Sequence, residues 1–446
     1  LWLAKQLPEA RAVLLQILSK QREIYGDNHS EVLDTLIALW EIHMESELVA
    51  ESKNYLAEAL KISTGLLGDK HWKTIDVKQD LKATTQLTEI DPRMQKRIFY
   101  LYTKGLNLSG VTAENVDRML AVADREIGVA EKTLGFESSL IAASYVRFAR
   151  LAARFDRLNY AVAFYLRGAS IAQKIYGDEN PLTASAIMDW SQICRRLHDD
   201  ERAFDLAVQA VHINRRLYGE WSSAYMNSLE LTATLYFEAD RYPQARTVLE
   251  KVKRLRTLSG GEQDVAFANT QNNLSQVYLK LDELELAQQE LEAVVARLPG
   301  DDRLQIEALE GLASVWFARS DVQKAVQLQA QATNLAKEHY EPDDIRYAYA
   351  LENLAAYHEI LGELDEAGNL LSNSLAIERA HLDRLGKLQG TRLRINAYLK
   401  ESRGLSHYLT IAAELGGMGE SAYELVTAWK AGAIRQGRAL AQNNET

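Results

Sequence analysis

The stretch KIYGDENPLTAS, from Lys174 to Ser185, contains a loop sequence that recurs several times in this chain. Close variants are EIYGDNHSEV from Glu23, GLLGDKHWKT from Gly65 and RRLYGEWSSA from Arg215. A glycine in such a loop can take the left-handed conformation that ends a helix, and an Asp or Asn beside it can cap the next helix. The recurrence therefore predicts a chain built from similar helical units.

The glycines of these loops are evenly spaced. Gly26 and Gly68 lie 42 residues apart, and after a disturbed stretch the same interval separates Gly135, Gly177, Gly219 and Gly261. A helix-borne alanine follows the same interval, with one step of 38 residues before Ala325, at Ala161, Ala203, Ala245, Ala287, Ala325 and Ala367. A fixed period of this size predicts a solenoid of stacked units.

Each unit is expected to contain two helices. An apolar site followed by a small residue recurs before each alanine, for example at Phe148-Ala149 and Leu274-Ser275. Three residues further on, a third column holds Ala152, Cys194, Tyr236, Tyr278, Trp316 and His358. This spacing gives the apolar stripe of an amphipathic helix, and the small residue lets neighbouring helices approach closely.

Composition agrees with a folded, helical protein. The chain has 446 residues, of which 47% are hydrophobic and 25% charged, and it contains only six prolines. We expect an all-α fold with almost no strand. The net charge of -11 argues against a nucleic-acid or membrane surface, and no apolar run approaches the roughly 20 residues that a membrane span needs.

Two features of the sequence, its cysteine content and its first residue, bear on the compartment and on the chain ends. The single cysteine, Cys194, excludes an intrachain disulfide and fits a reducing compartment, so the expected location is the cytoplasm. Because the chain begins at Leu1 rather than Met, we expect it to be a piece of a longer protein.

The repeat pattern resembles the tetratricopeptide repeat (TPR), in the longer variety found in kinesin light chains, over residues 5–70 and 140–380. The resemblance implies a right-handed superhelical solenoid of antiparallel helix pairs with a C-terminal helical connector. The expected divisions are TPR-like repeats over 1–70, irregular helical repeats over 71–135, regular 42-residue repeats over 136–380 and a long-helix connector over 381–446.

The last helical stretch resembles a second family. ESAYELVTAWKAGAIRQGRAL, from Glu420 to Leu440, is similar to the connector that joins TPR arrays to the caspase-like CHAT peptidase domain of bacterial proteins. The connector typically carries a Tyr-Glu-x-Val-x-x-Trp-Lys run, matched here by Tyr423, Glu424, Val426, Trp429 and Lys430. The resemblance implies that a cysteine peptidase domain would follow Thr446.

Catalytic chemistry within this chain is not expected. A Cys-His nucleophile is the sharpest alternative, but Cys194 falls in the packed column with Tyr236 and Tyr278, which favours a buried structural thiol. LSGGEQ, from Leu258 to Gln263, looks like an ATPase signature loop, yet the chain has no P-loop, and an inter-repeat turn is favoured. No residues have the spacing of a zinc site. We expect no catalytic residues, metal or cofactor.

The concave surface, formed by the first helix of each unit, is the expected binding surface. Its predicted peptide-binding residues are Arg150, Arg154, Gln192, Arg195, Arg196, Asn227, Asn269, Asn272, Gln276, Lys280, Glu310 and Glu352. Amides can bond both groups of a peptide backbone, and arginines bind carboxylates, so we expect a peptide or protein with an acidic and a basic end. The alternative is that these are solvated residues with salt bridges between repeats.

Three functions remain open on this sequence. The preferred one is the sensor or regulatory array of a CHAT peptidase, with that domain as a possible intramolecular partner. The others are a stand-alone adaptor for complex assembly, and the TPR region of a signalling or transcriptional regulator. Binding of RNA to the basic run KVKRLR, Lys251 to Arg256, is a minor alternative to a solvated helix face.

Overall fold

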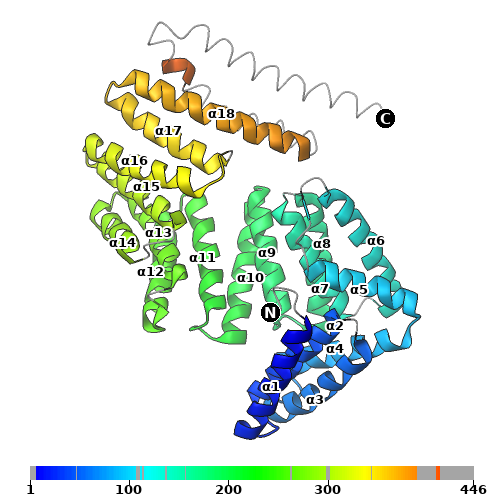
Figure 1. The fold of residues 1–446 in the computed structure, drawn as a ribbon. Coiled ribbons are helices and arrows are strands. Elements are labelled where there is room, and N and C mark those ends of the chain that lie inside the picture. The colour runs from blue at the N-terminus through cyan, green and yellow to red at the C-terminus, as the bar shows by residue number, and fades with distance from the viewer. Residues whose placement is uncertain are drawn as a thin grey trace. The chain divides into compact units, whose positions relative to one another are not determined.

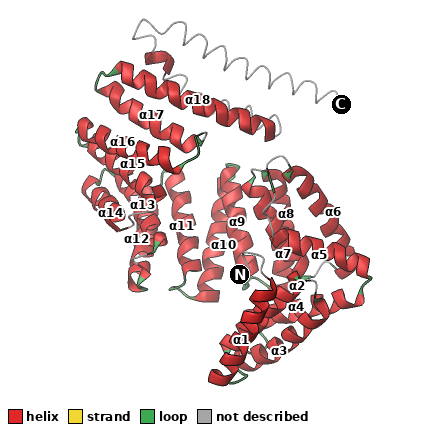
Figure 2. Cartoon of the chain, in the orientation of Figure 1, coloured by secondary structure: helices red, strands yellow, loops and turns green. Residues whose placement is uncertain are grey.

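A computed structural model describes residues 7–388, with short gaps at 47, 107–110, 113–114, 136–137, 156, 262–263, 298–301 and 343, and residues 408–411. Helices joined by short loops make up this part of the chain, and none of its residues forms a strand (Figures 1 and 2). The predicted all-α fold is confirmed.

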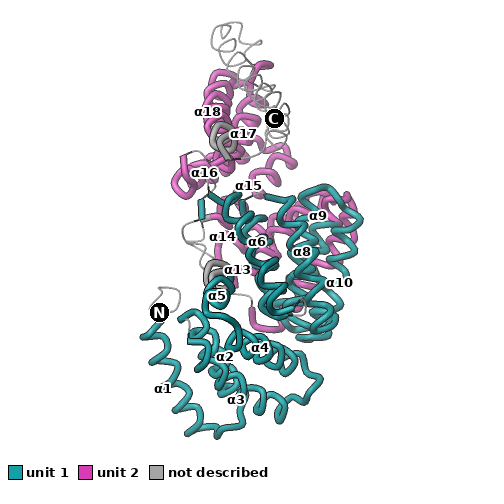
Figure 3. The backbone as a smooth tube through the Cα atoms, turned by 90° about the vertical axis from the view of Figure 1, so that its right-hand side faces the viewer, with its two compact units in different colours: residues 1–235 teal, residues 236–446 magenta. Residues whose placement is uncertain are grey.

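The helices fall into two compact units, residues 1–235 and 236–446 (Figure 3). The boundary between the units lies within α11. The helices of the first unit are α1 (Leu7–Tyr25), α2 (Ser30–Glu45), α3 (Val49–Leu67), α4 (Trp72–Glu89), α5 (Pro92–Leu106), α6 (Val116–Leu134), α7 (Ser139–Arg154), α8 (Leu158–Tyr176), α9 (Pro181–Arg196), α10 (Asp200–Tyr218) and most of α11 (Ser223–Glu238). Those that follow are α12 (Tyr242–Leu258), α13 (Val265–Lys280), α14 (Leu284–Arg297), α15 (Asp302–Ala318), α16 (Val322–His339), α17 (Ile345–Ile360) and α18 (Leu364–Leu388).

Helix pairs are the building block of both units. Helix α7 packs against α8 and α9 against α10, and in the second unit α13 packs against α14, α15 against α16 and α17 against α18. The periodic alanine of the second helix explains this close packing, because all six predicted positions from Ala161 to Ala367 are fully buried. With no side chain beyond Cβ, alanine lets the two backbones approach.

The turn inside the helix pairs from α9–α10 to α17–α18 has one backbone geometry. His198, Asp240, Asp282, Ser320 and Gly362 all have positive φ, between 56° and 77°. The next N–H then donates to a carbonyl five residues earlier, as from Glu283 to Tyr278 at 2.8 Å. This is the Schellman arrangement, which satisfies carbonyls that a helix end would otherwise leave unbonded.

The turn between pairs uses the glycines that define the repeat. Gly26, Gly68, Gly135, Gly177 and Gly219 have φ between 77° and 83°. At the next position the left-handed residue is Gly260, with φ of 75°, rather than Gly261 of the sequence pattern. The inter-repeat turn is present at LSGGEQ, displaced by one residue.

The disturbed stretch after Gly68 contains an additional helix. Gly68 and Gly135 are 67 residues apart, and α4, α5 and α6 occupy the interval. Helix α6 ends at Gly135 in the way the second helix of a pair does, while α5 packs against α6 and α7. Helix α5 is therefore an insertion into a helix pair.

Most of the predicted connector at 381–446 lies outside the described residues, which include only the end of α18 and residues 408–411. The CHAT-like segment from Glu420 to Leu440 lies wholly outside them.

Candidate functional site

A polar hollow in the second unit is the best candidate for a binding site. Its volume is about 360 Å³, and four helices contribute to its lining. The lining residues are Asn272, Asn273 and Gln276 from α13, Glu307, Glu310, Gly311 and Ser314 from α15, Gln329 from α16, and Asn353 and Tyr357 from α17. We call this hollow the amide pocket.

The repeat pattern explains why these side chains meet. Helices α13, α15 and α17 are the first helices of successive pairs, and α13 packs directly on α15. Gly311 sits where α15 meets α14, and a Cβ there would lie 2.9 Å from the Cδ atoms of the buried Leu291. Glycine at this position lets α15 approach α14 closely.

Hydrogen bonds connect Glu310 and Gln329 to the other residues of the amide pocket. Gln329 is 1% exposed, and its Nε2 donates to the Ala350 carbonyl at 3.2 Å and to Glu310 Oε1 at 3.4 Å. Asn353 also hydrogen-bonds Glu310. Ser314 Oγ donates to the main-chain oxygen of Glu310 at 3.0 Å. The carboxyl group of Glu310 is therefore held in a fixed place.

Burial raises the pKa of Glu310 above its ordinary value, and the nearby charge of Glu307 raises it further. The hydrogen bonds from Gln329 and Asn353 act in the opposite direction. Glu307 differs from Glu310 because its Oε1 accepts from Arg303 at 2.9 Å. The pocket thus contains one paired and one unpaired carboxylate among the described residues.

Three of the predicted groove residues, Asn272, Gln276 and Glu310, line the amide pocket. Asn269 and Lys280 lie on α13 outside it, and Asn269 Oδ1 accepts from Arg303 at 3.1 Å. Glu352 is half-buried on α17 and accepts from Ser374 Oγ at 3.3 Å. Whether these residues bind a peptide stays a prediction.

The predicted residues of the first unit lie on its α7, α9 and α11 helices. Arg150 pairs with Asp189 at 2.6 Å, and Arg196 donates to the Ala153 carbonyl at 2.9 Å. The guanidinium of Arg154 lies over the ring of Phe155, 5.9 Å from its centroid. The remaining three also lie on these helices: Gln192 and Asn227 are exposed and Arg195 is half-buried.

Several residues of the amide pocket were not predicted as groove residues. Asn273, Ser314, Asn353 and Tyr357 lie on the first helices, next to residues that the repeat register did identify. Gln329 lies on the second helix of its pair, where the pattern predicts packing only. The sequence feature that could have indicated such a pocket is the cluster of amide residues Asn272, Asn273 and Gln276, together with Asn353.

Cys194 and His358 share a sequence column but have different surroundings. Cys194 is 3% exposed within an apolar cluster, and burial raises the pKa of its thiol, which disfavours the nucleophilic thiolate. The prediction that Cys194 is buried is confirmed. His358 is half-buried, and its Nδ1 lies 2.5 Å from Glu363 Oε2.

The basic run KVKRLR lies on α12, where Arg256 is only 5% exposed. The prediction that this run forms a solvated helix face is therefore wrong for Arg256.

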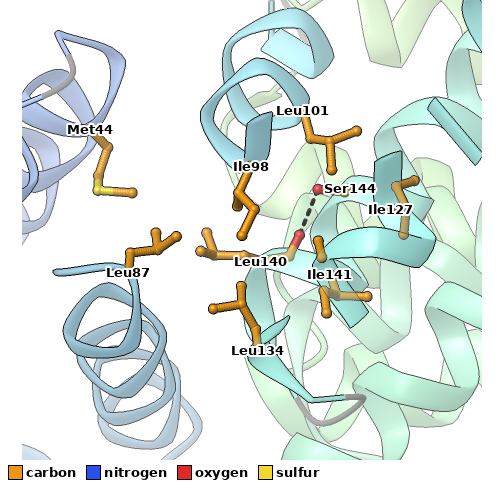
Figure 4. A pocket seen from close by; sticks show the side chains of 10 residues that line it. Met44, Leu87, Ile98, Leu101, Ile127, Leu134, Leu140, Ile141 and Ser144 are labelled. Carbon is orange, nitrogen blue, oxygen red and sulfur yellow. Dashed lines mark hydrogen bonds between the residues drawn. The ribbon is translucent and has the colours of Figure 1, made fainter. Parts of the chain in front are cut away.

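A second cavity, in the first unit, is apolar and too small for a ligand (Figure 4). Met44, Leu87, Ile98 and Leu101 contribute to its lining, and its volume is about 10 Å³, close to that of a single water. Its hydroxyl group, on Ser144, already donates to the Leu140 carbonyl at 2.7 Å. This space is a packing gap in the core.

Within the described residues, no group of His, Cys, Asp and Glu side chains is arranged to hold a metal ion. None of the helices in that part of the chain is long and apolar enough to cross a membrane.

Comparison with known proteins defines the fold only. No family model matches the chain, and no curated protein matches it. Among solved structures, the apo form of RapI matches with a TM-score of 0.50 and 12% identity, over 92% of this chain and 99% of that one. A tetratricopeptide repeat protein from Parabacteroides merdae matches with a TM-score of 0.46 and 14% identity, over 63% of this chain and 93% of that one.

A putative kinesin light chain of Podosopora anserina with TPR-like repeats also matches, with a TM-score of 0.38, 20% identity and coverage of 44% of this chain and 93% of that one. The buried alanine column and the paired helices, together with the likeness to RapI over most of the chain, define an all-α fold of the tetratricopeptide type.

Proposed function

We propose that the chain is a repeat scaffold that binds a protein or peptide, and that the ligand lies against α13, α15 and α17. The amide pocket carries this proposal, because it is the polar hollow that the first helices of successive repeats line together. First helices form the inner surface of such arrays, where repeat proteins bind their partners.

An extended peptide suits the chemistry of this pocket. Asn273, Gln276 and Asn353 are exposed at its rim, and each side-chain amide offers both a donor and an acceptor. A peptide backbone presents the same two groups alternately and leaves them unpaired when it is extended. Amides on two helices can therefore bond the main chain of a ligand without selecting its sequence.

Binding to an array of short random peptides tests the proposal. The strongest peptides of the array are synthesised, and their dissociation constants are measured with the wild-type chain and with the double variant Asn273→Ala/Asn353→Ala. We expect the double variant to bind about tenfold more weakly, since two main-chain hydrogen bonds are lost. Equal binding by both chains would place the ligand elsewhere.

The matched control uses the arginines of the first unit. In the variant Arg195→Glu/Arg196→Glu, both charges are reversed on α9 while the amide pocket is unchanged. Arg196 already donates to Ala153 and Arg150 to Asp189, so these two arginines have fewer hydrogen bonds left to donate to an acidic ligand. We expect this variant to bind the selected peptides as the wild type does.

We further propose that this scaffold is the sensor or regulatory region of a caspase-like CHAT peptidase. The run Tyr423, Glu424, Val426, Trp429 and Lys430, which lies outside the described residues, supports this relation. Ligand binding would then favour one curvature of the stacked helices and so bias the packing at the C-terminal end.

The natural reading frame on either side of Leu1 and Thr446 tests that relation. A domain with a paired His and Cys after Thr446 is the expected result. A frame that ends there, with no catalytic or DNA-binding domain before Leu1, would exclude the peptidase and favour an adaptor. An ATPase or helix-turn-helix domain before Leu1 would instead favour a signalling or transcriptional regulator.

A further inference from the structure

The amide pocket contains a buried acceptor that has no donor. Asn272 is 6% exposed, and its Nδ2 donates to Glu307 Oε2 at 3.4 Å. Its Oδ1 is enclosed by protein and accepts no hydrogen bond from any described residue. Rotating the amide by half a turn would place Oδ1 against the Glu307 carboxylate, so this orientation is the favoured one.

Such an oxygen is costly to leave unbonded. A buried polar atom without a partner costs about 1 to 3 kcal/mol of folding free energy. Because Asn272 lines the hollow, a small rotation of its side chain would turn Oδ1 toward a ligand that enters the hollow, and the ligand can then supply the missing donor. A group with N–H bonds to donate fits this place, and a carboxylate, which only accepts, does not.

The charge of the pocket narrows the choice further. Glu310 accepts neutral amide hydrogen bonds from Gln329 and Asn353 and forms no ion pair with a described residue. The nearby guanidinium of Arg303 pairs with Glu307 and also donates to Asn269. Glu310 is thus a half-buried carboxylate without a counter-ion in the described part of the chain.

We propose that the amide pocket binds the side chain of a lysine or arginine in an extended peptide, with its charged end between Glu310 and Asn272 Oδ1. A half-buried carboxylate is stabilised by a hydrogen-bonded cation, since the surrounding protein screens their attraction less than water does. Tyr357 lines the same hollow and offers its ring to the aliphatic stem of the lysine or arginine. The inference rests on the proposed peptide-binding function.

Peptide pools with one fixed central residue test the inference. The pools are acetylated and amidated, their flanking positions are random, and the central residue is lysine, arginine, norleucine, citrulline or glutamate. We expect the lysine and arginine pools to bind the wild-type chain about tenfold more tightly than the norleucine, citrulline and glutamate pools. Equal affinity for all five pools would overturn the inference and leave the scaffold function standing.

Variants of the chain locate the effect. Glu310→Gln keeps the shape of the side chain and removes its charge, so it should abolish the preference for lysine and arginine. Glu366→Gln removes the same charge from an exposed position of α18, and it should keep the preference. An unchanged preference in Glu310→Gln would overturn the assignment of the cation to this carboxylate.

A norleucine pool with a free α-amino group tests whether a peptide N-terminus is the cation instead of a side chain. We expect this pool to bind as weakly as the acetylated norleucine pool, and binding as tight as that of the lysine pool would overturn the side-chain assignment. Absence of binding to every pool, and to the peptides selected from the random array, would overturn the scaffold function itself.

Discussion

Single residues decide how this protein responds to pH, and the clearest case is a pair of carboxyls on α4. Asp76 accepts from Asn180 Nδ2 at 3.4 Å, and burial raises its pKa to about 6. Burial likewise raises the pKa of Asp80, to about 8, and the charges of Asp76 and Glu41 act in the same direction, against that of Arg147. No sequence pattern singles out this pair, because the insertion of α5 disturbs the register there.

The raised pKa of Asp80 predicts a loss of stability as the pH rises from 3.8 toward about 8. Since the folded pKa is raised above the unfolded value of 3.8, its contribution is fully present below that value and is lost as the pH rises toward about 8. Asp80→Asn should therefore raise the melting temperature at alkaline pH and have little effect at acid pH. Thermal unfolding followed by circular dichroism across this range is the measurement.

The control for this prediction is Asp205→Asn, which neutralises an exposed aspartate of α10. It should shift the melting temperature by a small amount at every pH. A pH profile of Asp80→Asn that runs parallel to the wild-type profile would show that Asp80 ionises normally in the folded protein.

The close contact between α7 and α8 also depends on one residue. A Cβ on Gly168 would lie 3.0 Å from Val146 Cγ2, 3.1 Å from Tyr145 Cβ and 3.3 Å from the Ala142 carbonyl oxygen. Gly168→Ala should lower the free energy of unfolding by about 1 to 3 kcal/mol, because the helices must separate. Urea unfolding measures the change.

The matched substitution is Gly128→Ala on α6, where an added Cβ meets nothing within 4 Å. It should raise the free energy of unfolding by up to about 1 kcal/mol through helix propensity. If the two alanine variants had equal stability, the tight crossing of α7 and α8 would be refuted.

Among the structural elements, the turn inside the helix pairs from α9–α10 to α17–α18 is repeated with different residues. Gly362 has the left-handed backbone that glycine tolerates, whereas Ser320 holds a φ of 65° at the equivalent place. A residue with a Cβ is destabilised in this conformation by roughly 1 to 2 kcal/mol. Because equivalent turns carry serine in one pair and glycine in another, exchanging these residue types tests the turn geometry.

Exchanging the residue types at these turns should have opposite effects. Ser320→Gly should raise the free energy of unfolding by up to about 1 kcal/mol, and Gly362→Ala should lower it by about as much. Chemical unfolding of the two variants beside the wild type gives both values. A loss of stability in Ser320→Gly, or no loss in Gly362→Ala, would contradict the shared turn geometry.

Much of the element structure could be predicted from the sequence because packing is periodic. The alanine column is buried at all six positions, and Phe148, Leu274 and their small neighbours are buried as expected. Periodicity identifies which residues lie on the same face of a helix. From this register we predicted that polar residues of α13 and α15 would share one surface.

Periodicity could not predict the depth or the partners of those polar residues. Asn272 lies at the border between the buried and exposed faces of α13, and its burial depends on Glu307 of the next pair. Gln329 enters the amide pocket from a second helix, which sequence register assigns to packing. Contacts of this kind depend on the rotation of neighbouring helices, to which a single sequence gives no direct signal.

Across the chain as a whole, contacts join mainly helices that are neighbours in the sequence, as in other stacked repeats. The two compact units each have such a stack, and the amide pocket lies entirely within the second. The first unit differs by the insertion of α5 and by the carboxyl pair of α4, whose pKa values are raised. We therefore expect ligand binding to stabilise the second unit more than the first.

Hydrogen–deuterium exchange with mass spectrometry, with and without the strongest lysine- or arginine-containing peptide of the array, would decide whether the amide pocket is the binding site. Amides protected by a bound ligand exchange more slowly, and every helix is followed in one experiment. We expect protection in α13, α15 and α17 that is lost in Glu310→Gln and kept in Glu366→Gln. Protection confined to helices of the first unit, or unchanged exchange at saturating peptide, would contradict peptide binding at this pocket.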